Sequence, residues 1–236
     1  GQAYFQLGTD KKSESEKLDY YEKALDSMLS AVRTAELEEY KPKENWYVLM
    51  AACYSELSSR IGKEEALYKQ LDIYEILVNL YPKKMYFIQL GGIYGQLDRE
   101  LDYMITLNAA YQKDLLDKES EYLALTQLLL LNNNPYWAAK VLEAGRIKKV
   151  PVIDEKTKEE KILPVVKDNE KNLKLLADAW RMAQEIELAI PIMEKAARLA
   201  KDGQTFIILG SLYLSEDKLE EAVDAIEQGL KKGKVK

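Results

Sequence analysis

Few side chains in this sequence could do chemistry. The 236 residues include no histidine, and the only cysteine is Cys53. The lack of histidine excludes Ser-His-Asp and Cys-His nucleophilic sites, histidine general bases and histidine-ligated metals. Paired acids such as Glu159/Glu160 and Glu220/Glu221 stand in charge-rich stretches, which is typical of a solvated face. We therefore expect a protein that is not an enzyme, with no catalytic, cofactor-binding or metal-binding residues.

Phosphate and nucleic-acid binding are also disfavoured. Residues 91–95 read Gly-Gly-Ile-Tyr-Gly, but they lack the GxGxxG spacing of a phosphate-binding loop and follow no predicted strand. The 16 tyrosines could stack on bases, yet 34 Lys and Arg stand against 40 Asp and Glu, a formal net charge of −6. An acidic balance opposes nucleic acid, and the lysines of residues 231–236 fit the solvated end of a helix. We expect no nucleic-acid partner.

Hydropathy and cysteine usage leave the compartment open. Hydrophobic residues make up 47% and charged residues 31% of the chain, as in a folded protein. The longest apolar stretch, residues 123–131, is too short to cross a bilayer and includes Thr126 and Gln127. No transmembrane segment is expected, and the first residues show no secretory leader. A single cysteine permits no intrachain disulfide, which fits the cytoplasm and the periplasm equally.

The elements that would position a site are helical repeats. The clearest unit places bulky, small and aromatic residues on one predicted helix, and small and bulky residues on the next. These residues are Phe206, Leu209, Gly210 and Tyr213, followed by Ala222, Ile226 and Gly229. Small residues let two antiparallel helices approach closely, and bulky residues fill the space between pairs. The spacing resembles the tetratricopeptide repeat.

The same spacing recurs upstream and predicts an all-α fold, in which tetratricopeptide-type helix-turn-helix repeats stack in a right-handed superhelix. We expect a single array over residues 1–236 that starts inside a repeat, as part of a longer protein would. The array would comprise a partial repeat at 1–40, repeats at about 43–82, 84–117, 119–147, 170–202 and 203–236, and an insertion at 148–167.

Helix boundaries are marked by particular residues. Asn134 can cap a helix that begins at Pro135, where a missing N–H costs nothing. Gly203 can end a helix before the last repeat. Extra residues near 60–66 predict that one or both helices of the 43–82 repeat are longer than usual.

One segment, residues 148–167, breaks the helical pattern. Two β-branched runs, at 150–153 and 162–166, flank a polar stretch. This order predicts a small β-hairpin or an irregular loop, and prolines within the runs fit a hairpin because an isolated hairpin has only edge strands. Insertions between repeats often contact partners. A tolerated insertion without a partner is the alternative.

The tetratricopeptide resemblance implies a concave groove, lined by the first helix of each pair, that binds a partner protein. The lining positions of such repeats include Tyr47, Ala51 and Tyr54; Ile88, Gly92 and Gln96; Leu123, Gln127 and Leu130; Lys174, Asp178 and Arg181; and Ile207, Ser211 and Leu214. The first three sets are mostly apolar, which favours an apolar helix or extended segment over the C-terminal carboxylate that chaperone-binding clamps grip. Alternatively, these side chains pack against each other or against a terminal helix.

Several stretches resemble a narrower family. They are residues 4–8 (YFQLG), 43–49 (KENWYVL), 89–95 (QLGGIYG), 135–143 (PYWAAKVLE) and 179–185 (AWRMAQE). Together they are similar to the periplasmic tetratricopeptide proteins of gamma-proteobacteria that are encoded beside TonB, ExbB and ExbD. The resemblance implies a periplasmic, non-catalytic scaffold or adaptor that supports TonB-type energy transduction to outer-membrane transporters. Its partners would be periplasmic segments of TonB, ExbB or ExbD.

Two other functions stay open at this point. The tyrosine and tryptophan content also suits a cell-envelope module that binds glycan or lipid. A cytoplasmic tetratricopeptide adaptor is the second alternative.

Overall fold

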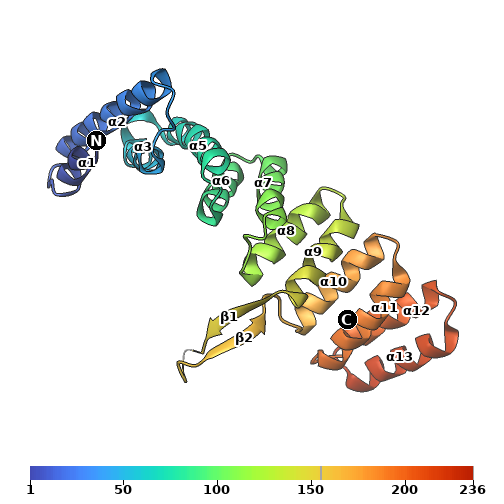
Figure 1. Ribbon diagram of the computed structural model, residues 1–236. Helices are drawn as coiled ribbons and strands as arrows, with labels where there is room; N and C mark the ends of the chain where they lie inside the picture. Colours follow the sequence, from blue (N-terminus) through green and yellow to red (C-terminus); the bar gives the residue numbers. More distant parts are fainter. Residues whose placement is uncertain (155, 236) are drawn as a thin grey trace. The chain divides into compact units, whose positions relative to one another are not determined.

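Paired helices build this chain (Figure 1). The structure is a computed structural model that describes residues 1–154 and 156–235. It divides into two compact units, Gly1–Leu115 and Leu116–Lys236, which we call unit 1 and unit 2. Among the described residues, no helix combines the length and the hydropathy that a membrane span requires.

In unit 1, α1 packs against α2, α3 against α5, and α6 against α7. The helices are α1 (Gln2–Thr9), α2 (Glu14–Leu37), α3 (Glu44–Glu56), α4 (Ser58–Ile61), α5 (Lys63–Leu80), α6 (Lys84–Gln96) and α7 (Glu100–Gln112). The extra residues predicted near 60–66 form the short helix α4 and the first turn of α5. Arg60 joins α4 to α2 through ion pairs with Asp19 and Glu22, both at 2.9 Å.

In unit 2, α8 packs against α9, α10 against α11, and α12 against α13. The elements are α8 (Glu119–Leu131), α9 (Pro135–Ile147), β1 (Lys149–Ile153), β2 (Glu160–Pro164), α10 (Glu170–Met182), α11 (Ile186–Leu199), α12 (Gln204–Ser215) and α13 (Leu219–Lys232). The prediction of an all-α repeat fold of tetratricopeptide type is confirmed, and of the two alternatives for the insertion the structure shows the β-hairpin. The arrangement of all pairs in one array stays a prediction.

Repeated tyrosine–glutamate hydrogen bonds join one helix pair to the next. Tyr94 on α6 donates its hydroxyl to Glu75 on α5, and Tyr213 on α12 donates to Glu194 on α11, both at 2.5 Å. Each bond spans 19 residues of sequence, so the same repeat position carries the same contact. Burial, followed by the bond to Glu194, raises the pKa of Tyr213 to about 12.

Close approach of helices explains the small residues. A Cβ added to Gly203 would lie 1.9 Å from the carbonyl oxygen of Gly229, which shows how tightly the segment before α12 packs on α13. The prediction that Gly203 ends a helix is wrong. Helix α11 ends at Leu199 with Ala200 as its C-cap, and Gly203 has a φ of −82°, which any residue adopts. The backbone conformation at position 203 would accept any residue, but the contact with Gly229 leaves no room for a Cβ.

The predicted start of α9 at Pro135 is confirmed, with Asn134 at the N-cap position. The Asn134 side chain makes no cap bond, however. Its Nδ2 instead donates to the Asn132 carbonyl oxygen at 2.7 Å.

Candidate partner-binding surface

A pocket of about 560 Å³ lies between α10 and α12. It is lined by Asp178, Arg181, Gln184, Ile186, Ile208, Ser211, Leu212 and Ser215. Asp178, Arg181 and Ser211 are residues that the sequence predicts for the groove, and the structure brings them together. We call this site the α10–α12 pocket.

The α10–α12 pocket has an apolar floor and a polar rim. Leu212 at the floor is 3% exposed. On the rim, the Nε of Arg181 lies 3.4 Å from the Oδ1 of Asp178, one helical turn away, and the two side chains are 48% and 40% exposed. Ser211 donates its hydroxyl to the Ile207 carbonyl oxygen at 3.2 Å. Such a site suits an amphipathic chain segment better than a small apolar molecule.

The other predicted lining residues of unit 2 lie outside the lining of this pocket. Lys174 and Ile207 are partly buried on α10 and α12. On α8, Leu123 is partly buried and Gln127 is exposed. Leu130 is partly buried on α8, and Leu214 is exposed on α12. A partner-binding role for these six residues stays a prediction.

In unit 1, the expectation that Tyr47 and Ala51 line an open surface is wrong. Their exposed fractions are 3% and 2%, and both belong to a buried cluster formed largely with side chains of α2. The physical reason is that α3 packs against α2, a helix of 24 residues, so this face of α3 is covered. Tyr54 is partly buried against the same cluster. For Tyr47 and Ala51 the structure therefore agrees with the alternative to an open groove, in which the predicted lining side chains pack against other parts of the protein.

The remaining predicted residues of unit 1 lie on α6. Ile88 is partly buried, whereas Gln96 is exposed and donates its Nε2 to the Gly92 carbonyl oxygen at 3.3 Å. Cys53 is fully buried, and burial raises the pKa of its thiol to about 12. A thiol held neutral in this way suits a core residue and not a nucleophile.

Sequence reasoning missed an apolar pocket of about 360 Å³ in unit 1. It is lined by Gln2, Phe5, Met28, Asn45, Trp46, Val48, Leu49 and Ala52. The α3 members at 45, 48, 49 and 52 follow the i, i+3, i+4, i+7 spacing of one helix face. The sequence contains this spacing, but the repeat numbering assigned the groove to a different face of the same helix, that of Tyr47, Ala51 and Tyr54.

The hairpin of β1 and β2 extends away from the helices of unit 2 (Figure 1). Its strands pair antiparallel, with Pro151 opposite Ile162 and Lys149 opposite Pro164. The apolar side chains of the hairpin are exposed to an unusual degree: Ile153 66%, Ile162 62%, Val152 41% and Leu163 37%. A two-stranded hairpin is marginal in water by itself, so its contacts with the helices must hold it in place.

Both outer edges of the hairpin carry a proline. The Asp154 N–H donates to the Glu159 carbonyl oxygen at 2.9 Å, and bonded and non-bonded pairs alternate from there along the ladder. Pro151 and Pro164 therefore fall in non-bonded pairs, where the missing N–H would face outward. Neither proline interrupts the pairing of the two strands.

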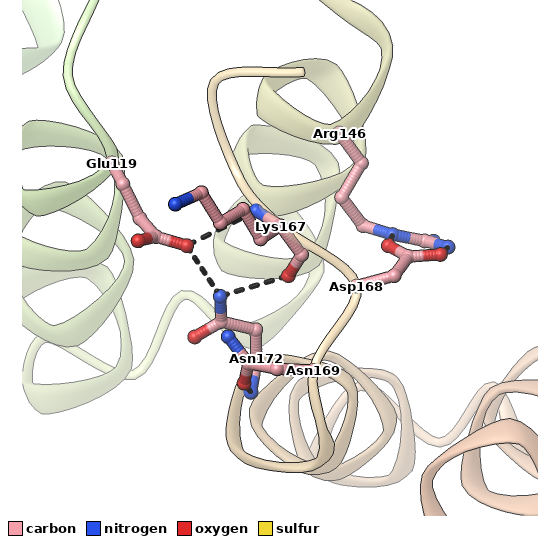
Figure 2. Close-up of polar contacts among 6 residues, drawn as sticks. All are labelled: Glu119, Arg146, Lys167, Asp168, Asn169 and Asn172. Atoms are coloured by element: carbon pink, nitrogen blue, oxygen red, sulfur yellow. Dashed lines mark hydrogen bonds and ion pairs between the residues drawn. The ribbon is translucent and has the colours of Figure 1, made fainter. Parts of the chain in front are cut away.

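A polar network fastens the segment after β2 to the helices (Figure 2). Glu119, in the first turn of α8, accepts hydrogen bonds from the Lys167 backbone N–H at 3.0 Å and from Asn172 Nδ2 at 2.7 Å. Asn172 Nδ2 also donates to the Lys167 carbonyl oxygen at 2.9 Å. Asn172 is 3% exposed. Its amide therefore links α8, the hairpin segment and α10 in a place that water barely reaches.

Two further contacts hold the same segment. Arg146 donates from Nε and Nη2 to the two carboxylate oxygens of Asp168, at 2.5 and 2.8 Å (Figure 2). This pairing lowers the pKa of Asp168 below its ordinary value. Val165 and Val166 are 5% and 1% exposed, so the base of the hairpin is part of the core.

Asp154→Ala is expected to loosen the hairpin at pH 7 without unfolding the helices. The Asp154 carboxylate pairs with Lys161 at 2.9 Å and accepts the backbone N–H groups of Lys156 and Thr157 at 3.0 and 3.1 Å. These bonds, led by the one from Lys161, hold the pKa of Asp154 below its ordinary value. A lowered pKa means that the stabilisation is present above the ordinary pKa of about 4 and is lost as pH falls below it.

Amide hydrogen exchange of residues 149–164 between pH 3 and 7 checks this prediction. Wild-type protection should fall at the acidic end, after correction for the intrinsic exchange rate, whereas the variant should be weakly protected throughout. Glu160→Ala, at an exposed position of the same hairpin, is the control and should behave as wild type. Equal protection of Asp154→Ala and wild type at pH 7 would contradict it.

The small-residue contacts and paired helices define a tetratricopeptide-type repeat fold. No protein-family model and no curated protein matches the sequence. Solved structures are similar at low identity. YrrB, a TPR protein with an unusual peptide-binding site, aligns with a TM-score of 0.52 and 13% identity over 84% of this chain and 91% of that one. MamA aligns with a TM-score of 0.51 and 14% identity over 77% of this chain and 91% of that one. These likenesses support the fold.

Proposed function

We propose that this chain is a non-catalytic protein-interaction scaffold that holds a segment of a partner in the α10–α12 pocket. The observation that carries the proposal is the meeting of Asp178, Arg181 and Ser211, three predicted groove residues, around one cavity. Tetratricopeptide-type arrays offer extended surfaces to partners. The similarity to YrrB, whose description includes a peptide-binding site, supports the same reading.

The partner that we propose is a periplasmic segment of TonB, ExbB or ExbD, with this chain acting in the periplasm in support of TonB-type transport. The sequence blocks at 135–143 and 179–185 are the support for this proposal. The second block contains Arg181 and Gln184 of the α10–α12 pocket, so the stretch that resembles the family also forms part of the candidate site. Fractionation of cells expressing the native protein tests the compartment, with the cytoplasm as the alternative.

Capture of the purified TonB, ExbB and ExbD periplasmic segments tests the partner. Ser211→Trp would fill the pocket and should lower capture by about tenfold or more, as expected for a residue central to an interface. Ser30→Trp, at an exposed position of α2, introduces the same bulk elsewhere and should leave capture unchanged. Equal capture by the Ser211→Trp variant and wild type would contradict the pocket. No enrichment of any segment would contradict the TonB assignment.

The alternative of a glycan- or lipid-binding module loses much of its motivation. It rests on aromatic content, and many of those side chains are buried: Tyr21, Tyr47, Tyr86, Tyr94, Tyr122 and Trp180. The adjacent Tyr136 and Trp137, 44% and 58% exposed, are the aromatic pair on which a cosedimentation test of this alternative would rest.

A further inference from the structure

Helix α10 carries a charged stripe on the face that borders the α10–α12 pocket. Lys171, Lys174, Asp178 and Arg181 follow one another at spacings of 3, 4 and 3, which places them on one helical face. Three of the four are cations. The stripe is a local feature, since the whole chain has a formal net charge of −6.

The facing helix supplies no charge to this surface. The residues of α12 that line the pocket are Ile208, Ser211, Leu212 and Ser215, none of which is charged. A ligand in the pocket would therefore meet Arg181 and Asp178 on the α10 side and aliphatic and hydroxyl groups on the α12 side, with Lys174 and Lys171 further along α10.

Arg181 is available to such a ligand. Its contact with Asp178 is made by Nε alone at 3.4 Å, which is long for a hydrogen bond between ions. Within the described parts of the chain this is the only polar contact of the Arg181 side chain, so both Nη atoms can donate hydrogen bonds to a carboxylate. Ile186, Ile208 and Leu212 beside it offer apolar surface to a neighbouring side chain.

We infer that the α10–α12 pocket selects an acidic segment, in which a Glu or Asp side chain binds Arg181 and an adjacent bulky aliphatic side chain enters the apolar floor. The inference rests on the proposed function and names the chemistry of the segment. Charge complementarity is the argument: an arginine paired with a carboxylate beside an apolar contact gives both orientation and selectivity. Lys174 and Lys171 lie further along the same face of α10, where they would favour additional acidic residues in the bound segment.

Three fluorescein-labelled peptides of repeated Leu-Ser-X triplets, with Glu, Gln or Lys at X, test the inference by fluorescence anisotropy. The Glu probe should bind about tenfold more tightly than the Gln probe, the Lys probe should bind weakest, and added salt should reduce the difference. Arg181→Gln should remove the Glu preference. Asp178→Asn should tighten binding of the Glu probe, because a like charge is removed.

Arg198→Gln is the matched control. Arg198 lies on α11, is 70% exposed and pairs with Glu194 four residues earlier at 3.1 Å, so it is a surface arginine paired along its own helix that does not line the α10–α12 pocket. This variant should keep the Glu preference. Equal affinity for the Glu and Gln probes, an unaltered preference in Arg181→Gln, or no saturable binding of the Glu probe would overturn the inference. If the Glu and Gln probes bound wild type equally well and Ser211→Trp abolished the binding of both, the scaffold function would stand while the acidic preference failed.

Discussion

Gly203→Ala is expected to destabilise the last helix pair by about 2–3 kcal/mol, the upper range for overpacking in a close contact. The added Cβ would lie 1.9 Å from the Gly229 carbonyl oxygen and 2.7 Å from its carbon. Backbone atoms cannot rotate away, so α12 and α13 must separate. The conformation of Gly203 suits alanine, with φ −82°, and the loss would therefore come from the contact alone. Urea denaturation, together with hydrogen exchange over residues 203–232, measures it.

Gly92→Ala is the control for this prediction. Gly92 is an interior residue of α6, and nothing lies within 4 Å of an added Cβ. Removing a helical glycine there should stabilise the protein by about 0.5–1 kcal/mol. The same substitution should thus lower the free energy of unfolding at Gly203 and raise it at Gly92. If Gly203→Ala were neutral, the close approach of α12 and α13 would be contradicted.

Asn172→Asp is expected to cost about 3 kcal/mol at pH 7. The substitution removes both Nδ2 donor bonds, to Glu119 and to the Lys167 carbonyl oxygen, and places a second carboxylate beside Glu119 at a position that is 3% exposed. Buried groups left without partners and buried like charges are among the costlier defects in proteins. The segment after β2 should lose protection from hydrogen exchange as a result.

Two measurements distinguish the loss of this network from a general loss of helix: the pH dependence of the destabilisation and the effect of a neighbouring substitution. The cost relative to wild type should shrink toward about pH 4, where the introduced carboxyl takes up a proton. Asn169→Asp provides the matched change. The Asn169 Oδ1 accepts the Asn172 backbone N–H at 2.9 Å as an N-cap, a role that aspartate fills equally well. A cost for Asn172→Asp that is independent of pH would argue against the network.

The fold was predictable because its signals are local and repeat. The spacing of Leu209, Gly210 and Tyr213 lies within one helix, and it recurs with the same residue types at Leu90, Gly91 and Tyr94 and with alanine and tryptophan at Leu176, Ala177 and Trp180. The hairpin was one of two readings of residues 148–167. The polar network that fixes it could not be read from the sequence, since Glu119 and Asn172 are 53 residues apart, and single polar residues of this kind carry no periodic signal.

The candidate site was predictable only in part. The repeat numbering selected Asp178, Arg181 and Ser211, which the structure places around one pocket, and their role in binding a partner stays a prediction. It failed at Tyr47 and Ala51 because it treats all repeats alike, whereas the preceding helix α2 has 24 residues and covers α3. Whether a face of a helix is exposed depends partly on how far the neighbouring helix extends over it. The repeat position of a residue does not give the length of that neighbour.

The prolines of the hairpin have a consequence for solubility. An exposed strand edge rich in β-branched residues can template cross-β stacking between molecules. Each free edge here lacks one of its outward N–H groups, at Pro151 on β1 and at Pro164 on β2, so a strand from another molecule could not complete a ladder along either edge. The hairpin can thus present Ile153 and Ile162 to solvent while remaining a poor seed for fibril growth.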